Sequence, residues 1–221
     1  MTETQLQLLI DSFPKILLPG LTMTVPLTVI SFAIGLVIAL FTALVQVARV
    51  PVLKQLARAY VWVIRGTPLL VQLFVVFYGL SYMGLMVEAF TAAVAVFALN
   101  TGAYCAEDIR AAIESIPGGQ LEAGYCSGMT WWQTMRRIIL PQAMRTAFPP
   151  LSNSLISLVK DTSLASNITI VEMFTATRKI AARTYEHFIL YCEVAVIYLV
   201  FCSLLTLLQH WLEKKLARKE A

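Results

Sequence analysis

The residues best suited to bind a small charged molecule lie in one apolar stretch, 148–165. Within it, Ser154, Ser157 and Asp161 follow one another at i, i+3 and i+7, which places two hydroxyls and a carboxylate on one face of a helix. A charge in an apolar span costs about 2.5–3.5 kcal/mol on insertion scales, so its presence suggests a function. One interpretation is a face that contacts a substrate within a pore. The alternative is structural, with Lys160 extending to the membrane surface and Asp161 capping a helix break.

Other polar side chains within apolar stretches are weaker candidates for the same site. They are Gln72, Asn100 and Thr162, and hydrogen bonds between helices explain them at least as well as a ligand does. Glu107 and Arg110 come near the end of the stretch that holds Asn100. We interpret this charged pair as gating or structural rather than as part of a binding site.

A second cluster lies in the polar stretch 108–147. Gly124 and Gly128 are one helical turn apart, which predicts a notch where another surface approaches closely. Glu122 is expected at the start of a short helix, where the helix dipole favours an anion. Pro141 is expected to end the run and change the chain direction. The apolar residues around the notch include Ala123, Ile138 and Leu140. An amphipathic loop packed on its own membrane domain is the alternative.

These clusters need membrane-spanning helices to position them. Of the 221 residues, 58% are hydrophobic and 14% are charged, whereas soluble domains carry about a quarter charged residues. Apolar blocks of roughly 20 residues are what a bilayer core demands of a helix. The pattern predicts an all-α membrane protein with five spans, at residues 21–47, 68–85, 89–107, 148–165 and 188–208.

The basic residues predict an orientation in the membrane. Most of the seventeen lysines and arginines fall in 48–66, 108–147 and 209–221. The positive-inside rule puts these stretches in the bacterial cytoplasm, with the N-terminus outside and the C-terminus inside. One domain, 1–221, is expected, with 1–19 as an outer interfacial segment, 108–147 as a cytoplasmic loop and 209–221 as a basic tail. This topology explains the basic clusters without a nucleic-acid partner, and membrane lipid is an expected partner.

No catalytic or metal-binding set emerges from the sequence. It has no glycine-rich phosphate loop ending in Gly-Lys, so an ATPase is excluded. His187 and His210 are expected near opposite membrane faces and do not form a metal site. The four cysteines do not suggest a disulfide framework. The alternative from another class is an ion-coupled secondary transporter, which would normally show an inverted repeat.

The polar loop resembles a known family. Its residues match the Glu-Ala-Ala signature of permease subunits in ATP-binding-cassette (ABC) importers, except that Gly124 replaces an alanine, at a cost of about 1 kcal/mol in helix stability. The resemblance implies a type I importer permease fold whose cytoplasmic coupling helix docks on a separate ATPase. The positions that carry this coupling role are Glu122, Ala123, Gly124, Gly128, Ile138, Leu140 and Pro141.

Stretches 65–74, 99–110 and 149–164 resemble the polar amino-acid branch of that family. The resemblance implies two ATPase copies that carry ATP and Mg²⁺, with no cofactor in this chain. It also implies a second permease copy or a paralogue, with a homodimer favoured, and a periplasmic or lipid-anchored amino-acid-binding protein. The basic cluster expected outside is either a docking surface for that protein or a solvated helix, and consists of Arg178, Lys179 and Arg183.

The resemblance also bears on the substrate. In relatives that carry basic amino acids, the position of Ser154 is typically acidic, so a cationic side chain would lack its counter-charge here. Asp161 is then expected to hold the α-ammonium group of an amino acid. The stretch 99–164 resembles permeases of the cystine-importing group, so the resemblance favours L-cystine as the expected substrate. Glutamine, glutamate, arginine and histidine are the alternatives. The candidate contacts are Gln72, Asn100, Ser154, Ser157, Asp161 and Thr162.

Overall fold

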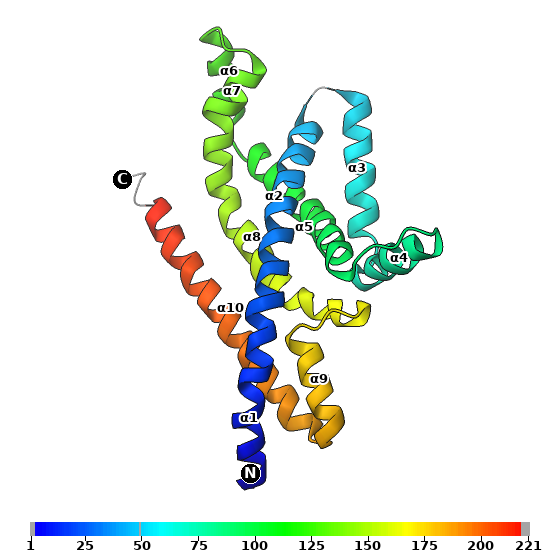
Figure 1. Ribbon diagram of the computed structural model, residues 1–221. Coiled ribbons are helices and arrows are strands. Elements are labelled where there is room, and N and C mark those ends of the chain that lie inside the picture. The colour runs from blue at the N-terminus through cyan, green and yellow to red at the C-terminus, as the bar shows by residue number, and fades with distance from the viewer. Residues whose placement is uncertain (1–2, 49, 218–221) are drawn as a thin grey trace.

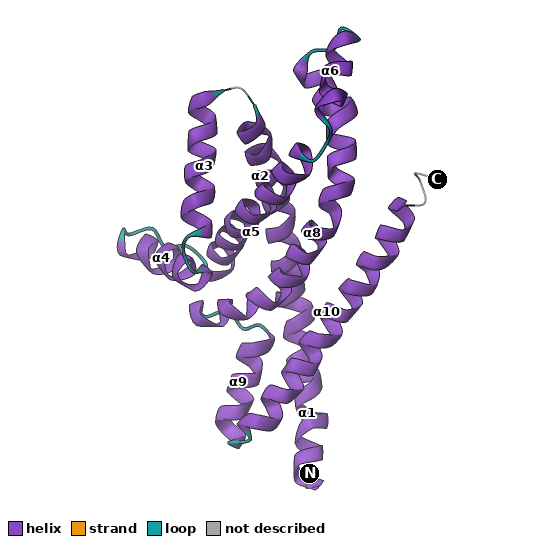
Figure 2. Cartoon of the chain, turned by 180° about the vertical axis from the view of Figure 1, so that it is seen from behind, coloured by secondary structure: helices purple, strands orange, loops and turns teal. Residues whose placement is uncertain are grey.

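The computed structural model describes residues 3–48 and 50–217. The predictions for residues 1–2, for Arg49 and for the tail from 218 to 221 lie outside the described residues. Within the described ranges every regular element is a helix (Figure 2), as the predicted all-α class requires. The helices form an elongated bundle with the N-terminus at one end and the short helix α6 (Gly118–Cys126) at the other (Figure 1).

The N-terminal part of the chain is one continuous helix. α1 (Glu3–Pro19) passes through a π turn, η1 (Gly20–Thr24), into α2 (Val25–Val47), and the three make a 45-residue helix. At a rise of about 1.5 Å per residue, it exceeds the roughly 30 Å of a bilayer core.

The N-terminal segment therefore differs from the separate interfacial element expected over 1–19. Ser12 and Ile16 are buried where α1 packs on α9 (Met173–Thr184) and α10 (His187–Ala217). Ser12 Oγ donates a hydrogen bond to Glu193 Oε2 at 2.6 Å. Packing on these two helices holds the segment in line with α2, so the expected boundary near residue 20 is a π turn rather than a break.

The second apolar stretch belongs to a broken helix pair. α3 (Pro51–Arg65) and α4 (Leu69–Tyr82) are bent by 102° at the three residues between them. Gly66 ends α3, and Pro68 takes an extended conformation before α4 begins. Proline lacks the backbone N–H that helix continuation needs. The expected span 68–85 is therefore only the second half of a bent pair.

Fewer helices than the five expected are long and apolar enough to cross a membrane. Among the described residues, three helices qualify, at Glu3–Val47, Ala89–Glu114 and His187–Leu216, and the bent pair makes a fourth if it is counted as one span. α8 (Leu140–Asp161), which holds the expected span 148–165, does not qualify. Its serines, asparagine and charged residues lower its hydropathy. The count of five stays a prediction.

The core is organised around α5 (Ala89–Glu114). α2 packs along α5, α8 crosses it, and α3 and α4 lie against it (Figure 1). Small residues make the α2–α5 contact: Ala39 and Ala43 are fully buried, and a Cβ at Gly35 would lie 3.1 Å from the Ala98 carbonyl oxygen. Small residues let helix backbones approach closely, which is a main source of packing energy inside a membrane.

The segment after α6 runs as one helix into the core. α7 (Trp131–Thr134) continues through a second π turn, η2 (Met135–Ile139), into α8. The prediction that Pro141 ends this run is wrong, because Pro141 lies in the first turn of α8. The π turn closes with a bond from Leu140 N–H to the Met135 carbonyl. A π turn also stands two residues before Pro26 in the N-terminal helix, so in both places a wider turn accommodates a proline.

A buried carboxylate joins the last elements of the fold. After η3 (Thr162–Ile168), Glu172 is fully buried at the start of α9. Its oxygens accept hydrogen bonds from the backbone N–H groups of Phe174 and Thr175, each at 2.7 Å, and from the Tyr198 hydroxyl at 3.0 Å. Burial raises the pKa of Glu172 above its usual value, while these hydrogen bonds oppose the shift. Glu172 thereby fastens α9 to α10.

Candidate functional site

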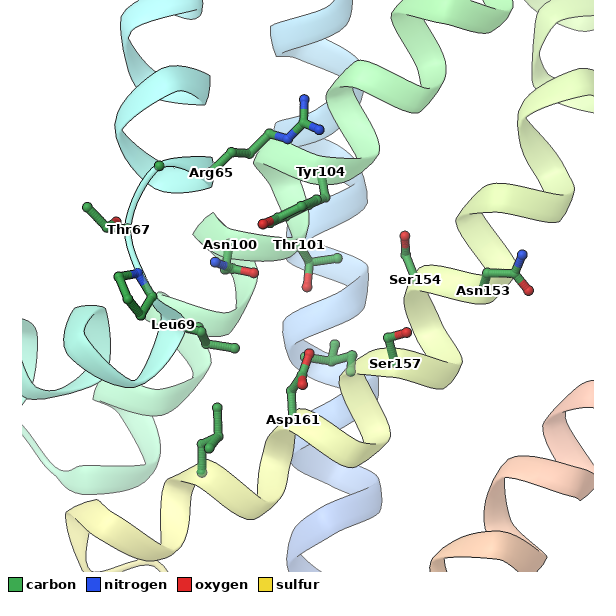
Figure 3. Close-up of a pocket in the computed structure, with 14 residues that line it drawn as sticks. Arg65, Thr67, Leu69, Asn100, Thr101, Tyr104, Asn153, Ser154, Ser157 and Asp161 are labelled. Atoms are coloured by element: carbon green, nitrogen blue, oxygen red, sulfur yellow. The ribbon is translucent and has the colours of Figure 1, made fainter.

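A polar cavity of about 670 Å³ lies where α8, α5 and the α3–α4 bend meet (Figure 3). Such a volume falls within the range of roughly 300–1,000 Å³ for small-molecule sites. Asn100, Thr101 and Tyr104 line it from α5, and residues 65–69 line it from the bend. The cavity is not enclosed by this chain alone.

The α8 wall of the cavity carries the face expected from residue spacing. Ser154, Ser157 and Asp161 all line the cavity, with Asp161 pointing into it (Figure 3). Lys160, which directly precedes Asp161 in the sequence, lines a different hollow together with Tyr198. Asp161 precedes η3 without a side-chain capping bond. Among residues 3–48 and 50–217, its carboxylate has no ion-pair partner within 4.0 Å. The capping alternative therefore does not describe this carboxylate.

The three weaker candidates divide between cavity and framework. Asn100 lines the cavity and donates from Nδ2 to Gln72 Oε1 at 3.1 Å. Gln72 is not in the lining; its Nε2 donates to the carbonyls of Ile64 at 2.7 Å and Thr67 at 3.0 Å, and so it holds the α3–α4 bend. Thr162 is fully buried and donates to its own helix, at the Val159 carbonyl, at 2.6 Å. The structure brings only Asn100 of the three to the cavity.

Arg65 is a cavity residue absent from the candidates predicted by sequence. It lines the rim at the end of α3, with its guanidinium 5.1 Å from the centre of the Tyr104 ring and 3.8 Å from Glu107 Oε2. Figure 3 shows Arg65 and Asp161 on opposite sides of the cavity. The cavity therefore has a cationic end and an anionic end. The available sequence signal was the Gly66-Thr67-Pro68 break directly after the charge.

Glu107 and Arg110 form part of an ion-pair chain along α5. Arg110 Nη2 lies 2.7 Å from Glu107 Oε2, and Arg110 Nη1 lies 2.6 Å from Glu114 Oε2. Because Glu107 also faces Arg65, the chain reaches the rim of the cavity. This geometry agrees with a structural or gating interpretation of the pair.

The second predicted cluster is divided between two places: Glu122, Ala123, Gly124 and Gly128 lie in α6 and the turn after it, and Ile138, Leu140 and Pro141 lie where η2 enters α8. Glu122 is exposed in the middle of α6, which begins at Gly118 directly after an extended Pro117. The expectation that Glu122 starts the helix is therefore wrong, and the helix dipole does not act on its charge there. In the part of the chain that the structure describes, no ion pair of Glu122 occurs within 4.0 Å. Its carboxylate is free to meet a partner surface.

The two glycines of the expected notch have separate structural roles. Gly128 lies beyond α6 with φ +75°, and the N–H groups of Gly128 and Met129 bond to the carbonyls of Tyr125 and Gly124 at 2.9 and 3.0 Å. This is a Schellman motif, which needs a left-handed residue. Gly124 is buried, and a Cβ there would lie 2.6 Å from Thr134 Oγ1. At Gly124 the notch prediction is wrong, because Thr134 of the same chain fills the space, whereas the space beside Gly128 is open.

Comparison with known proteins decides the family. Residues 35–218 match the family described as binding-protein-dependent transport system inner membrane component. The chain belongs to this family. The identity and fold class suggested by the Glu122 loop are thus confirmed.

Individual relatives agree with the family over nearly the whole chain. The L-cystine transport system permease protein TcyB of Bacillus subtilis (strain 168) is 49% identical over 209 residues, covering 94% of this chain and 89% of TcyB. The probable amino-acid ABC transporter permease protein YckA of the same organism is 41% identical, covering 96% and 93%. A crystal structure of an amino acid ABC transporter with histidines superposes with a TM-score of 0.89 at 37% identity, covering 97% of this chain and 100% of that chain.

Membership of this permease family defines the general role of the chain. It is the membrane subunit of an ABC transporter, and the ATPase activity lies in a separate subunit. Its partners include that ATPase and a substrate-binding protein. An ion-coupled secondary transporter is accordingly not favoured.

Proposed function

We propose that this permease subunit carries a zwitterionic polar amino acid, L-cystine, through the cavity between Arg65 and Asp161. The observation that carries the proposal is the presence of Arg65 at one end of the polar cavity and Asp161 at the other (Figure 3). The Arg65 guanidinium suits an α-carboxylate, and the Asp161 carboxylate suits an α-ammonium group. Both contacts would be charge-assisted hydrogen bonds, the stronger class.

Hydroxyl and amide groups complete the proposed site. Ser154, Ser157 and Asn100 offer neutral hydrogen-bonding groups between the two charges. Because Ser154 is neutral, a cationic side chain would find no counter-charge at that position. Gln72 acts on the site through Asn100 and the bend rather than by touching substrate.

The symmetry of L-cystine supports a homodimer of this chain. The cavity is not enclosed by one chain, so a second copy would close it. Two copies related by a two-fold axis would present two Arg65–Asp161 pairs. L-Cystine is itself two-fold symmetric about its disulfide and has an ammonium and a carboxylate at each end. Each end would then meet one pair.

The relatives support an amino acid as the substrate and leave one alternative to L-cystine. TcyB, named for L-cystine, is 49% identical to this chain. The amino acid transporter crystallised with histidines is 37% identical and shares the fold. Another polar amino acid is therefore the second candidate. The neutral side chain of Ser154 favours the side chain of cystine, which has no net charge, over the cationic side chains of arginine and protonated histidine.

We propose the remaining parts of the machine from the resemblance of this chain to importer permeases. Two ATPase copies bind ATP and Mg²⁺, and each receives one α6, with Glu122 and Ala123 on its exposed face. Closure of the ATPase pair would draw the α6 helices together and turn the pore outward, toward the binding protein. We place α6 and the C-terminus in the cytoplasm, and α9 with its Arg178, Lys179 and Arg183 on the outer side, as the basic residues suggest.

The test is uptake of labelled L-cystine by proteoliposomes that hold this chain, its ATPase and its binding protein. Unlabelled glutamine, glutamate, arginine and histidine compete in parallel. We expect ATP-dependent uptake that excess cystine alone suppresses strongly. A partner ATPase that cannot hydrolyse ATP is the matched control.

Two outcomes would contradict the proposal at different levels. Uptake of arginine or histidine without cystine uptake would overturn the substrate and the interpretation of Ser154. Uptake that continues with the inactive ATPase would contradict the ATP-driven mechanism itself.

A further inference from the structure

A second polar hollow is lined by residues of α2, α3 and α5. Its volume is about 310 Å³. It is separate from the amino-acid cavity, with which it shares no lining residue. Its polar lining consists of Gln46, Lys54, Arg58, Glu107, Arg110 and Glu114.

Two of the three cationic side chains in this hollow take no part in its ion pairs. Arg110 contacts both carboxylates, with Nη2 2.7 Å from Glu107 Oε2 and Nη1 2.6 Å from Glu114 Oε2. Lys54 and Arg58 stand one helical turn apart on α3. Among the described residues, neither has an acidic partner within 4.0 Å. The hollow therefore has an excess of positive charge on its α3 wall.

A buried amide adds an unused hydrogen-bond donor. Gln46 is only 5% exposed, and its Nε2 has no hydrogen-bond partner within the described structure. Its side chain lines the hollow and faces the Glu107 carboxylate, which Arg110 already pairs, but it does not reach hydrogen-bond geometry to that group. Buried donors are almost always paired, and an unpaired one calls for an explanation. A ligand with an acceptor atom in the hollow would supply the missing partner.

We propose that this hollow binds a phosphate-class oxyanion. One oxygen accepts a hydrogen bond from Gln46 Nε2, and the other oxygens meet the charges of Lys54 and Arg58. Phosphate oxygens accept several hydrogen bonds at once, which suits one amide and two cations. Basic pockets between membrane helices bind lipid head groups, so the anion is either the head group of an anionic lipid or a free phosphate from solution.

The experiment uses the purified complex of this chain with its ATPase in detergent. Native mass spectrometry counts bound phosphatidylglycerol against phosphatidylcholine. In a second arm, thermal unfolding is followed as inorganic phosphate replaces chloride at constant ionic strength. The test variant is Lys54→Gln/Arg58→Gln. The matched control, Lys179→Gln/Arg183→Gln, removes two cations at the same helical spacing from exposed positions on α9.

We expect the test variant to bind the anion roughly tenfold to thirtyfold more weakly, since each cation near a membrane surface contributes about 1 kcal/mol. A loss confined to phosphatidylglycerol identifies a lipid head group, and a loss confined to inorganic phosphate identifies a soluble anion. The ATPase itself binds phosphate equally in every variant, so only differences between variants count.

A second variant keeps the test valid if the double substitution prevents assembly. Gln46→Glu preserves the shape of the side chain but replaces the donor with a negative charge, and we expect it to abolish the binding. Equal anion binding by wild type, Gln46→Glu and the α9 control would overturn the proposal. So would an equal loss in the test and control variants.

Discussion

The amino-acid cavity and the α6 segment use their polar residues in opposite ways. In the cavity, the carboxylate of Asp161 is left without a protein ion-pair partner among the described residues. In the α6 segment, local irregularities are satisfied within the chain: Gly128 closes a Schellman motif, and Thr130 and Gln133 form a capping box. The cavity thus keeps a carboxylate without a described ion-pair partner, whereas the turns of the α6 segment are held by hydrogen bonds within the chain. Changes of charge should affect uptake through the cavity most. In the α6 segment, changes of volume should affect stability, and a change of charge at the exposed Glu122 should affect only the docking of a partner.

The largest effect is expected from Asp161→Asn, which keeps the shape and removes the charge. Losing a hydrogen bond to a charged group costs about 1.5–3 kcal/mol, so kcat/KM for uptake should fall roughly tenfold to hundredfold. Lys160→Met is the matched control, because Lys160 lines a different hollow. Equal losses in the two variants would show that the charge on this helix serves folding rather than substrate.

The next effect concerns the exposed face of α6. Glu122→Lys reverses a charge that has no described partner in this chain, and we expect the ATPase to co-purify about tenfold less efficiently. Gln120→Lys adds the same side chain at another exposed position of α6 and should leave co-purification unchanged. Unaltered ATPase recovery with Glu122→Lys would remove this residue from the coupling surface.

A smaller effect tests the fixed shape of the α6 segment. Gly124→Ala places a methyl group against Thr134, and overpacking of this kind costs about 1–3 kcal/mol. Thermal unfolding of the complex should show this loss, and Thr134→Ala should relieve most of it in the double variant. Additive losses would mean that the two side chains do not compete for space.

The smallest effect concerns selectivity within the cavity. Ser154→Asp adds a carboxylate beside Ser157 and should improve competition by arginine about fivefold, because a solvent-exposed ion pair contributes up to about 1 kcal/mol. Competition assays with labelled cystine measure this change. Unchanged competition by arginine would mean that the side chain of the substrate does not reach position 154.

Helical periodicity explains which parts of the site were predictable from sequence. The spacing of Ser154, Ser157 and Asp161 places them on one face because α8 is regular there. The signature around Glu122 identified the family, because it is a local pattern. Such patterns need no knowledge of the packing of distant helices.

The parts of the site that the sequence did not predict depend on contacts between distant residues or on local backbone geometry. Arg65 reaches the cavity only because the chain bends by 102° between α3 and α4. The side chain of Thr134, ten positions along the chain, fills the space beside Gly124. Pro141 continues the helix because a π turn precedes it, and residue types do not predict that turn. The excess positive charge beside Gln46 likewise arises where three separate helices meet.

The most direct test of the central claim measures which end of the ligand Asp161 holds. Binding of labelled L-cystine to the purified complex is competed with cystamine, which lacks the carboxylates, and with dithiodipropionate, which lacks the ammonium groups. The wild-type chain should bind dithiodipropionate roughly tenfold to hundredfold more weakly than L-cystine. In Asp161→Asn this difference should almost disappear, while the penalty for cystamine persists. An ammonium contribution of the same size in both proteins would contradict the assignment of Asp161.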